Sequence, residues 1–557
     1  MRPLLTFVLL ASLAGPAALS YQAQLPAFGT APRQERGMSG MVSSAHPLAT
    51  DAGIETLKAG GNAFDAALAV AAALNVVEPA MSGLGGYGTI LAWDAKDQRV
   101  RYLNAAGRIP ALADPDAFRA PAADYLKNRT GAKAVSTPAN LHAWEALVKL
   151  RGRLNYAKAL EPAIRLAEEG FILDAAGAVV IADAFNEFPE HAKRIFGRDN
   201  KPLAAGDRLV QKDLARTFQA VIRSTPSVFY EGEIAAAVER AVQEAGGFLT
   251  LADLKKDRAE WMDPISIEYR GYEVFTAAPP ANAFDALVRL GMMGVSRSRL
   301  LGHNSVGYLH RFAEITKHGY WVRLRYAGDP GVAKPPLGEL LSEAYWEKEV
   351  GRLDPAHARP FEPPVRSEGK DGHTTHFVIA DKWGNVISAT QTLGRAFGSR
   401  IMPAGTGIWL NNALAFSTFE PKGNAMDVFP GRRKLSGDCP VIILRNARPW
   451  AALGSPGGHA IGQIVPQIIM NLVDFGMPID EAIGAPRVSF VEPDVLAVED
   501  GIPADVRSAL AAMGHNVRVV RALGNAQGLT IAYDSDGHPQ TFRGGADPRG
   551  SGAAKSY

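Results

Sequence analysis

Two adjacent threonines, Thr374 and Thr375, stand between His373 and His376. A threonine hydroxyl is a weak nucleophile, but a threonine at the start of a chain can use its own α-amino group as the base. The pKa of a free α-amino group is about 7.7–8.0, which is close to working pH. The pattern therefore suggests the hypothesis that the chain cuts itself between His373 and Thr374 and exposes a nucleophile.

The segments on either side of the threonine pair favour this hypothesis. Residues 330–371 are rich in proline, polar and charged residues, which predicts an exposed, flexible segment leading into the cut. The residues that follow are expected to form a strand, which would hold a new chain start rigid. The spacing alone is also compatible with a threonine pair at the start of an ordinary strand, because threonine is common in sheets.

A hairpin is predicted directly after the histidine. The stretch THFVIADKWGNVISATQTL suggests strands over residues 375–380 and 386–393, with Gly384 in the left-handed position of the turn. If Trp383 is the centre of the turn, Thr374 lies directly opposite Thr392. The Cβ atoms of such cross-strand partners are about 4.5–5.5 Å apart. The hairpin therefore places a second hydroxyl beside Thr374.

Two glycine-rich turns are further candidates for chemistry. The stretch PWAALGSPGGHAIGQ predicts a strand, a turn through Gly457 and Gly458, and a helix from about residue 460. The backbone N–H groups of such a turn can bind an anion or an oxyanion. The alternative is that the turn only connects the strand to the helix. The stretch SGLGGYGTILAWD has its glycines before a strand, which is the reverse of a phosphate-binding loop, so a tight backbone passage is expected instead.

The remaining elements suggest a mixed fold that contains no metal centre. Two helices are expected within residues 46–79, separated by Gly60-Gly61, with Asn62 as the cap of the second. Residues 135–260 are rich in helix signals, and residues 265–280 suggest a strand pair. Three histidines near one long helix lack the compact spacing of metal ligands, so no metal is expected.

Composition indicates an ordinary globular protein. The chain has 557 residues, of which 47% are hydrophobic and 21% are charged, and its net charge is +2. No long run of one sign appears, so neither nucleic acid nor an anionic membrane is expected as a partner. The single cysteine, Cys439, excludes an internal disulfide and is expected in the core.

The N-terminus has the layout of a secretory signal peptide. Met1-Arg2 is followed by an apolar stretch over residues 4–14 and by small residues at Ala18 and Ser20. A membrane anchor needs about 20 apolar residues, which is longer than this stretch. Residues 1–20 are therefore expected to be removed, and the protein to be exported to the periplasm or secreted, without a stable membrane span.

Several motifs together resemble the γ-glutamyltransferases, a family of N-terminal-nucleophile (Ntn) hydrolases. The motifs are TTHFVIADKWGNVISATQTL, GTGIWLNN, KLSGDCPVII and GSPGG, together with SGLGGYGTILAWD and RYAGDP, and the resemblance covers about residues 37–545. It implies an α+β fold, a four-layer αββα sandwich built by two subunits cut from one precursor. The large subunit would be residues 21–373 and the small subunit residues 374–557.

The resemblance also implies roles for individual residues. Thr374 would be the nucleophile and Thr392 the threonine that hydrogen-bonds it. Gly457 and Gly458 would supply the oxyanion-hole amides, and Ser436 would hold a substrate carboxylate. An amide substrate would acylate Thr374, and water or a second amine would then accept the acyl group without a metal or an organic cofactor.

Other residues depart from the family pattern at the positions that hold the glutamyl group. Where the family has an arginine, this chain has Ala106, and where the family has its second serine, this chain has Gly437. The position two residues after the second threonine, which is an asparagine in the family, is Gly394 here. The stretch ALAFS after Asn411-Asn412 is one residue shorter than in the family and lacks both the acidic or amide residue and the aspartate that bind an α-amino group. The segment that matches the lid, residues 416–434, is also short. A zwitterionic group needs opposite charges or hydrogen bonds once it leaves water.

These departures predict an acyl group other than glutamyl. Arg108, Arg395 and Arg400 are candidates for holding a different acid. Two alternatives stay open: a genuine γ-glutamyltransferase or glutathione hydrolase, and a catalytically inactive exported binding protein on this scaffold, which would remain uncut.

Overall fold

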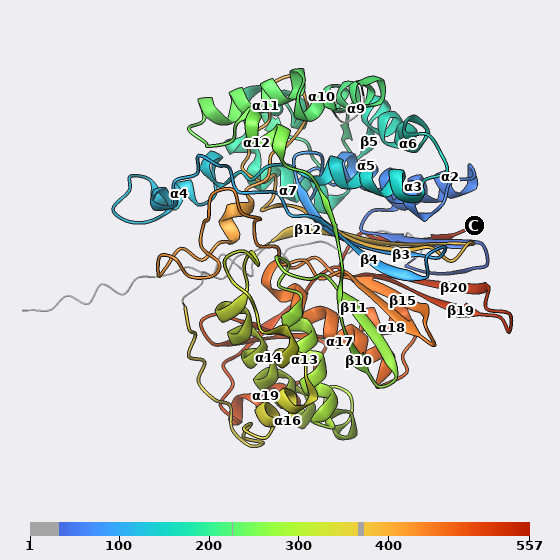
Figure 1. Ribbon diagram of the computed structural model, residues 1–557, viewed down its shortest axis with the longest axis vertical. Coiled ribbons are helices and arrows are strands. Elements are labelled where there is room, and N and C mark those ends of the chain that lie inside the picture. Colours follow the sequence, from blue (N-terminus) through green and yellow to red (C-terminus); the bar gives the residue numbers. More distant parts are fainter. Residues whose placement is uncertain (1–32, 225–226, 366–371) are drawn as a thin grey trace, which may run out of the picture.

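The computed structural model describes residues 33–365, except 225–226, and residues 372–557. Two seven-stranded sheets lie face to face between two layers of helices, which gives four layers in the order αββα (Figure 1). One sheet has the order β21(Ala553–Ser556), β2(Gly40–Ser44), β12(His373–Asp381), β13(Val386–Gly394), β3(Tyr87–Asp94), β4(Arg99–Ala105), β9(Glu260–Met262). The other has the order β1(Gln34–Gly37), β20(Pro539–Ala546), β19(Gln527–Tyr533), β15(Arg448–Gly454), β14(Val441–Arg445), β11(Tyr272–Thr276), β10(Ile265–Tyr269). The predicted fold class is confirmed.

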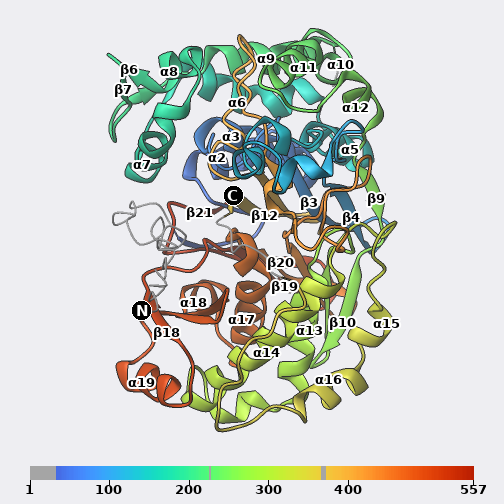
Figure 2. The same ribbon diagram turned by 90° about the vertical axis from the view of Figure 1, so that its left-hand side faces the viewer.

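The helices of the upper layer in Figure 1 come from the first half of the chain. They are α2(Pro47–Lys58), α3(Ala63–Val77), α4(Tyr125–Asn128), α5(Asn140–Arg151), α6(Tyr156–Glu169), α7(Ala175–Ala184), α8(Glu190–Phe196), α9(Lys212–Ser224), α10(Ser227–Tyr230), α11(Glu233–Glu244) and α12(Leu251–Lys256). Figure 2 shows α7, α8 and the short pair β6(Gly197–Arg198) and β7(Lys201–Pro202) together at one end of this layer. Another short pair joins β5(Phe171–Ile172) to β8(Arg208–Leu209).

Helix α3 is the centre of this layer because every one of its residues is buried. Asn62 caps it as predicted, since its side chain accepts from the backbone of Asp65, whose carboxylate accepts from the Asn62 backbone in return. The helix packs on β12 and β13 on one side and on α5 and α6 on the other. It therefore supports the hairpin from behind.

The lower layer mixes segments from both halves of the chain. It contains α13(Phe284–Val295), α14(Val306–Tyr326), α15(Leu337–Leu340), α16(Glu343–Val350), α17(Ile461–Val473), α18(Ile479–Gly484) and α19(Ala504–Ala512), with a small sheet of β16(Val488–Val491), β17(Val495–Glu499) and β18(Val517–Val520). Cys439 is buried here without a disulfide, as expected.

The prediction of one continuous flexible segment over residues 330–371 is wrong for part of its length. Residues 337–350 form α15 and α16, and Ser342 caps α16 by accepting from the backbone of Tyr345. Trp346 is buried against Gly291 of α13, where a Cβ would lie 2.3 Å from the indole. The segment is rich in proline, but the buried side chain of Trp346 fixes it to the core. Residues 366–371 lie outside the described part of the chain.

The predicted hairpin is confirmed in its register. Thr374 pairs with Thr392, and Gly384 has the left-handed φ of 84° that the turn requires. Both strands extend slightly beyond the predicted ends, since His373 pairs with Gly394 within the hairpin, and β2 and β3 pair with β12 and β13 on the outer sides. Residues on either side of the predicted cut therefore share one sheet.

The predicted signal peptide, residues 1–20, lies outside the described residues. Within the described ranges, the helices are too short or too polar for any of them to traverse a bilayer.

Candidate active site

A chain of hydrogen bonds joins the two threonines to the predicted cleavage point. The Thr374 hydroxyl donates to Thr392 Oγ1 at 3.2 Å, and Thr392 Oγ1 donates to the His373 carbonyl oxygen at 2.6 Å. The Gly394 amide donates to Thr392 Oγ1 at 2.8 Å. A hydroxyl has one donor and two acceptor positions, so Thr392 is fully engaged. Its only proton points at the carbonyl of the peptide bond between His373 and Thr374.

A β-bulge falls at this same peptide bond. The register between β12 and β13 shifts between His373 and Thr374, because His373 pairs with Gly394 while Thr374 pairs with Thr392. The intervening Leu393 leaves the ladder, and its amide donates to the Met81 carbonyl at 2.8 Å. Bulges re-aim side chains at functional sites. Here the bulge turns the peptide carbonyl toward the Thr392 hydroxyl.

Strand alternation separates the two candidate threonines. Thr375 points away from Thr392 and donates to Glu78 Oε2 at 2.8 Å, just after the C-terminus of α3. Burial raises the pKa of Glu78 to about 7, although the hydrogen bond from Thr375 acts to lower it. Only Thr374 therefore shares a face with Thr392.

The two histidines beside the threonines are held in their neutral forms. Burial lowers the pKa of His376 to about 3, and its Nδ1 lies 2.9 Å from Thr390 Oγ1. Its ring packs against Gly454, where a Cβ would lie 2.3 Å from the imidazole. Burial, with the nearby charge of Arg395, lowers the pKa of His373 to about 4. His376 is thus a core residue of the sheet pair.

The glycine turn lies next to the nucleophile. Gly457 and Gly458 have positive φ of 143° and 56°, which side chains rarely adopt. Gly458 lines the same pocket as Thr374. Gly372 packs on the turn so closely that a Cβ there would lie 2.7 Å from Gly458 Cα and 3.0 Å from its nitrogen. The residue two positions before Thr374 therefore packs on the amide of Gly458, one of the two predicted oxyanion donors.

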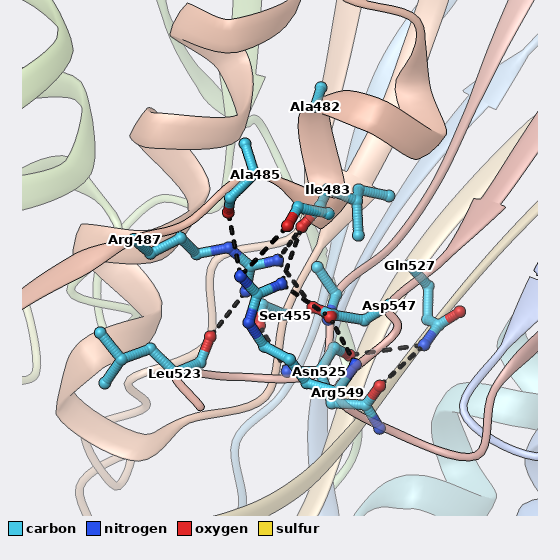
Figure 3. A network of polar contacts seen from close by, with 12 residues as sticks. Ser455, Ala482, Ile483, Ala485, Arg487, Leu523, Asn525, Gln527, Asp547 and Arg549 are labelled. Atoms are coloured by element: carbon cyan, nitrogen blue, oxygen red, sulfur yellow. Dashed lines mark hydrogen bonds and ion pairs between the residues drawn. The ribbon is translucent and has the colours of Figure 1, made fainter. Parts of the chain in front are cut away.

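A buried charge network supports this turn from behind (Figure 3). The Ser455 hydroxyl donates to the Pro456 carbonyl at 2.7 Å and accepts from the Asn525 amide at 3.3 Å. The next amide along the chain, that of Ala526, donates to Asp547 at 2.8 Å. Asp547 is fully buried and pairs with Arg487 at 2.7 Å.

The charge of Asp547 is stabilised by two guanidinium groups. Burial opposes its ionisation, but Arg487, together with Arg549 at 3.0 Å, keeps its pKa below the ordinary value. Arg487 also donates to the Leu523 carbonyl at 2.6 Å. The network thus fixes residues 523–526, which in turn hold Ser455 at the start of the glycine turn.

A pocket opens beside Thr374 in the described part of the chain. Its lining consists of Tyr87, Arg323, Gly372, Thr374, Thr392, Phe416, Lys434, Leu435, Gly437, Asp438, Gly458, His459 and Ile461. These residues come from β3, β12 and β13 of one sheet, from α14 and α17(Ile461–Val473) of the lower helical layer, and from the loops and short turns between elements. Three of the predicted residues, Thr374, Thr392 and Gly458, meet here.

The predicted substrate-binding residues lie outside this lining. Ser436 is buried, and its Oγ accepts from the Asp438 amide at 3.2 Å and lies 3.3 Å from Thr89 Oγ1. The Arg108 side chain pairs instead with Glu260 at 2.9 Å and with Asp257 at 3.6 Å.

The other two predicted arginines are also absent from the lining. The Arg395 side chain is exposed, while its backbone amide donates to Asn412 at 2.9 Å. Arg400 forms an ion pair with Glu187. Carboxylates outside the pocket attract Arg108 and Arg400, which sequence spacing could not indicate.

Sequence reasoning missed the charged residues that do line the pocket. They are Arg323 from α14, and Lys434 and Asp438 from the segment before β14. The KLSGDCPVII motif contains Lys434 and Asp438, but the resemblance assigned no role to their charges. Arg323 lies two residues before the RYAGDP motif, so that motif did not include it. Across residues 33–365 and 372–557, aside from 225–226, no group of three His, Cys, Asp or Glu side chains could hold a metal ion.

Comparison with known proteins identifies the family. The family model described as Gamma-glutamyltranspeptidase matches residues 49–557. The chain belongs to the gamma-glutamyltranspeptidase family. A glutathione hydrolase proenzyme of Bacillus subtilis strain 168 is 35% identical over 93% of this chain and 91% of its own length. The acylase ACY 1 proenzyme of Pseudomonas sp. strain SE83 is 35% identical over 93% of both chains.

Solved structures of the family share the fold. The crystal structure of a cephalosporin acylase from Bacillus halodurans superposes with a TM-score of 0.86 at 29% identity, covering 96% of this chain and 98% of that one. The gamma-glutamyltranspeptidase of Helicobacter pylori covers 59% of this chain and 95% of its own with a TM-score of 0.56 at 28% identity. The protein is thus a hydrolytic enzyme of the gamma-glutamyltranspeptidase family, with the Ntn-hydrolase fold.

Proposed function

We propose that this gamma-glutamyltranspeptidase homologue is a self-processing threonine hydrolase that cleaves an amide through an acyl-enzyme on Thr374. The observation that carries the proposal is the chain of hydrogen bonds from Thr374 through Thr392 to the His373 carbonyl. It aligns a nucleophile, a polarising hydroxyl and the bond to be cut. The proenzyme names of the relatives support the same interpretation.

The first step of the proposal is self-cleavage. Thr374 Oγ1 attacks the carbonyl carbon of His373, whose oxygen accepts the proton of the Thr392 hydroxyl as a hydrogen bond. The peptide C–N bond breaks, and the hydroxyl proton passes to the Thr374 nitrogen. Water hydrolyses the resulting ester, which leaves a carboxylate on His373 and a free α-amino group on Thr374.

The second step is turnover with the new amine as the base. The amine takes the proton of the Thr374 hydroxyl, and the oxygen attacks the carbonyl carbon of a small amide. The amides of Gly457 and Gly458 stabilise the oxyanion, and the leaving amine departs with the proton. Water or a second amine then attacks the ester and restores the hydroxyl. This scheme uses no metal and no organic cofactor.

The two products of self-cleavage are proposed to remain together. The large subunit would be residues 21–373 and the small subunit residues 374–557. The pairing of β2 with β12 and of β3 with β13 supports a stable complex, because separation would expose the buried edges of four strands. The layout of residues 1–20 supports export to the periplasm or secretion.

The proposed acyl group is not glutamyl. Ser436 is occupied by the Asp438 amide, and Gly437 has no hydroxyl where the family carries its second serine. A side chain at Gly394 would clash with Asn412, because a Cβ would lie 2.4 Å from its Oδ1. The names of relatives favour glutathione hydrolysis as a second candidate. The retained hydrogen bonds at Thr374 argue against an inactive binding protein.

The proposal is tested by the release of p-nitroaniline from a panel of acyl anilides that includes γ-glutamyl-p-nitroanilide. We expect the wild type to cleave at least one non-glutamyl anilide faster than the glutamyl compound, and Thr374→Ala to cleave none. Thr375→Ser is the matched control, because it keeps the hydroxyl bonded to Glu78 and should retain turnover. Equal activity of Thr374→Ala and the wild type would contradict the proposal.

A further inference from the structure

The peptide bond between His373 and Thr374 lies between two parts of the site. On one side, the His373 carbonyl accepts from the Thr392 hydroxyl of the hairpin at 2.6 Å. On the other side, the preceding residue, Gly372, packs against Gly458 of the glycine turn, and both glycines line the same pocket. The position of this peptide bond therefore depends on how closely residue 372 can approach the turn.

Residue 372 has no space for a side chain. A Cβ there would lie 2.7 Å from Gly458 Cα and 3.0 Å from the Gly458 nitrogen, with the Phe416 ring at 3.7 Å. Carbon atoms in good contact are about 3.5–4.0 Å apart, so an alanine would need a shift of about 0.8 Å or more. The atoms that it meets first belong to the backbone, which cannot turn aside as the end of a flexible side chain does.

The glycine turn is held in place from behind. Gly524 packs on it so closely that a Cβ there would lie 2.6 Å from Ser455 Oγ and 3.2 Å from the Pro456 carbonyl oxygen. Ser455 Oγ also accepts from the Asn525 amide at 3.3 Å. Close-packed interiors transmit strain rather than absorb it. The turn therefore does not move back to make room for a side chain at residue 372.

The end of the hairpin is fixed on the opposite side. The Asn412 amide donates to the Leu393 carbonyl at 2.9 Å, and its Oδ1 accepts from the Arg395 amide at 2.9 Å. A Cβ at Gly394 would already lie 2.4 Å from Asn412 Oδ1. The displacement caused by a side chain at residue 372 therefore falls on the peptide segment itself. It moves the scissile carbonyl away from its place beside the Thr392 hydroxyl.

We propose that Gly372 is a positioning residue for self-cleavage. Its missing side chain lets the chain pass over the glycine turn and places the His373 carbonyl beside the Thr392 hydroxyl and the Thr374 nucleophile. This inference rests on the proposed function, in which Thr374 attacks that carbonyl. The requirement ends once the bond is cut, because His373 is then a chain end that no longer has to join the turn to Thr374.

The rate of cutting tests the proposal. Wild type, Gly372→Ala and Gly372→Val are made by cell-free translation, and the precursor band is followed over time. A misplacement of about 1 Å costs a reaction about 100-fold, so we expect Gly372→Ala to cut about 100-fold more slowly and Gly372→Val more slowly still. Gly338→Ala is the matched control, because a Cβ there meets nothing within 4 Å, and it should cut at the wild-type rate.

Turnover by the cut protein separates positioning from damage to the turn. The Gly458 amide is one of the two proposed oxyanion donors, so a deformed turn would lower kcat. We expect cut Gly372→Ala to match the wild type in kcat and KM, per cut molecule, on the anilide that the wild type cleaves fastest. A lower kcat per cut molecule would overturn the positioning role.

A pair of uncut variants controls for folding. Gly372→Ala combined with Thr374→Ala should melt at nearly the same temperature as Thr374→Ala alone, because the displacement is confined to the peptide segment. A much lower melting temperature of the double variant would show a folding defect and overturn the inference.

The failure of this inference differs from the failure of the proposed function. A wild type that is cut, beside Gly372→Ala that is cut at the same rate, would overturn the role of Gly372 alone. A wild type that stays uncut would contradict the proposed function and this inference with it.

Discussion

The nucleophile end and the acyl end of the pocket are built in different ways. The nucleophile end is a hairpin in which Thr374 and Thr392 face each other across adjacent strands. The acyl end is assembled from α14 and from the segment before β14, which are separated by about a hundred residues. The first end holds the residues that we propose to be catalytic, whereas the second has a glycine, Gly437, where a serine is expected from the family pattern and is lined by Arg323 and Lys434. In this proposal, catalysis and specificity belong to separable parts of the site.

The largest effect is expected for Thr392→Val, which should slow self-cleavage at the nucleophile end. Valine keeps the shape but removes the hydroxyl that holds both Thr374 and the His373 carbonyl. Loss of one donor to a developing oxyanion slows a reaction by about 100- to 1000-fold, so self-cleavage should slow by that factor. A time course of the precursor band on a denaturing gel measures it. Thr392→Ser should process at close to the wild-type rate, and wild-type kinetics in the valine variant would refute the role of Thr392.

Asp547→Ala tests whether the nucleophile end depends on the buried network behind the glycine turn. Removing one partner of a buried ion pair leaves the other charge unpaired, here on Arg487 and Arg549, and costs about 3–5 kcal/mol of unfolding free energy. Chemical denaturation should show this loss. Glu161→Ala is the control, since the Lys158–Glu161 pair is exposed and should contribute less than about 1 kcal/mol. An unchanged denaturation midpoint for Asp547→Ala would show that the turn does not need this network.

Glu78, which accepts a hydrogen bond from Thr375 of the hairpin, gives the stability of the protein a pH dependence. Burial raises its pKa from the ordinary value of 4.5 to about 7 in the folded state, so folding favours the protonated carboxyl. Its stabilising contribution is present below about pH 4.5 and is lost as pH rises through about 7. The total loss is at most about 3 kcal/mol.

The comparison of wild type with Glu78→Gln isolates this effect. The variant keeps an acceptor for Thr375 but cannot ionise, so its melting temperature should fall less than that of the wild type between pH 5 and pH 7. Parallel melting curves for the two proteins across this range would mean that Glu78 titrates normally.

The smallest effect is expected for Gly437→Ser, which tests the acyl end through stability and substrate preference. A Cβ there would meet its nearest neighbour, the Gly458 carbonyl oxygen, at 3.6 Å, which is ordinary contact. Stability should therefore change by less than about 0.5 kcal/mol. The relative turnover of γ-glutamyl-p-nitroanilide should rise by a few-fold, because a hydroxyl is restored where the family binds a carboxylate. A drop in self-cleavage would show instead that the two ends are coupled.

The same contrast explains how far the sequence could predict the molecule. The register of the hairpin follows from the position of Gly384 in the turn, so the Thr374–Thr392 pair was predictable from local spacing. The four-layer fold followed from the resemblance to a family. Arg323 and Lys434 were missed because only tertiary packing brings them together, and Arg108 was proposed because a sequence does not show Asp257 or Glu260 beside it. The helices over residues 337–350 were missed because the prolines of the segment indicated an exposed loop. The sequence does not show that Trp346 is buried against α13 and holds the segment in place.

The central claim is that Thr374 becomes the first residue of a small subunit. Intact mass spectrometry of the purified protein beside its Thr374→Ala variant tests it most directly. The account predicts two fragments in the wild type, with the smaller beginning at Thr374, and one uncut chain in the variant. An uncut wild type, or a smaller fragment that begins at another residue, would contradict it.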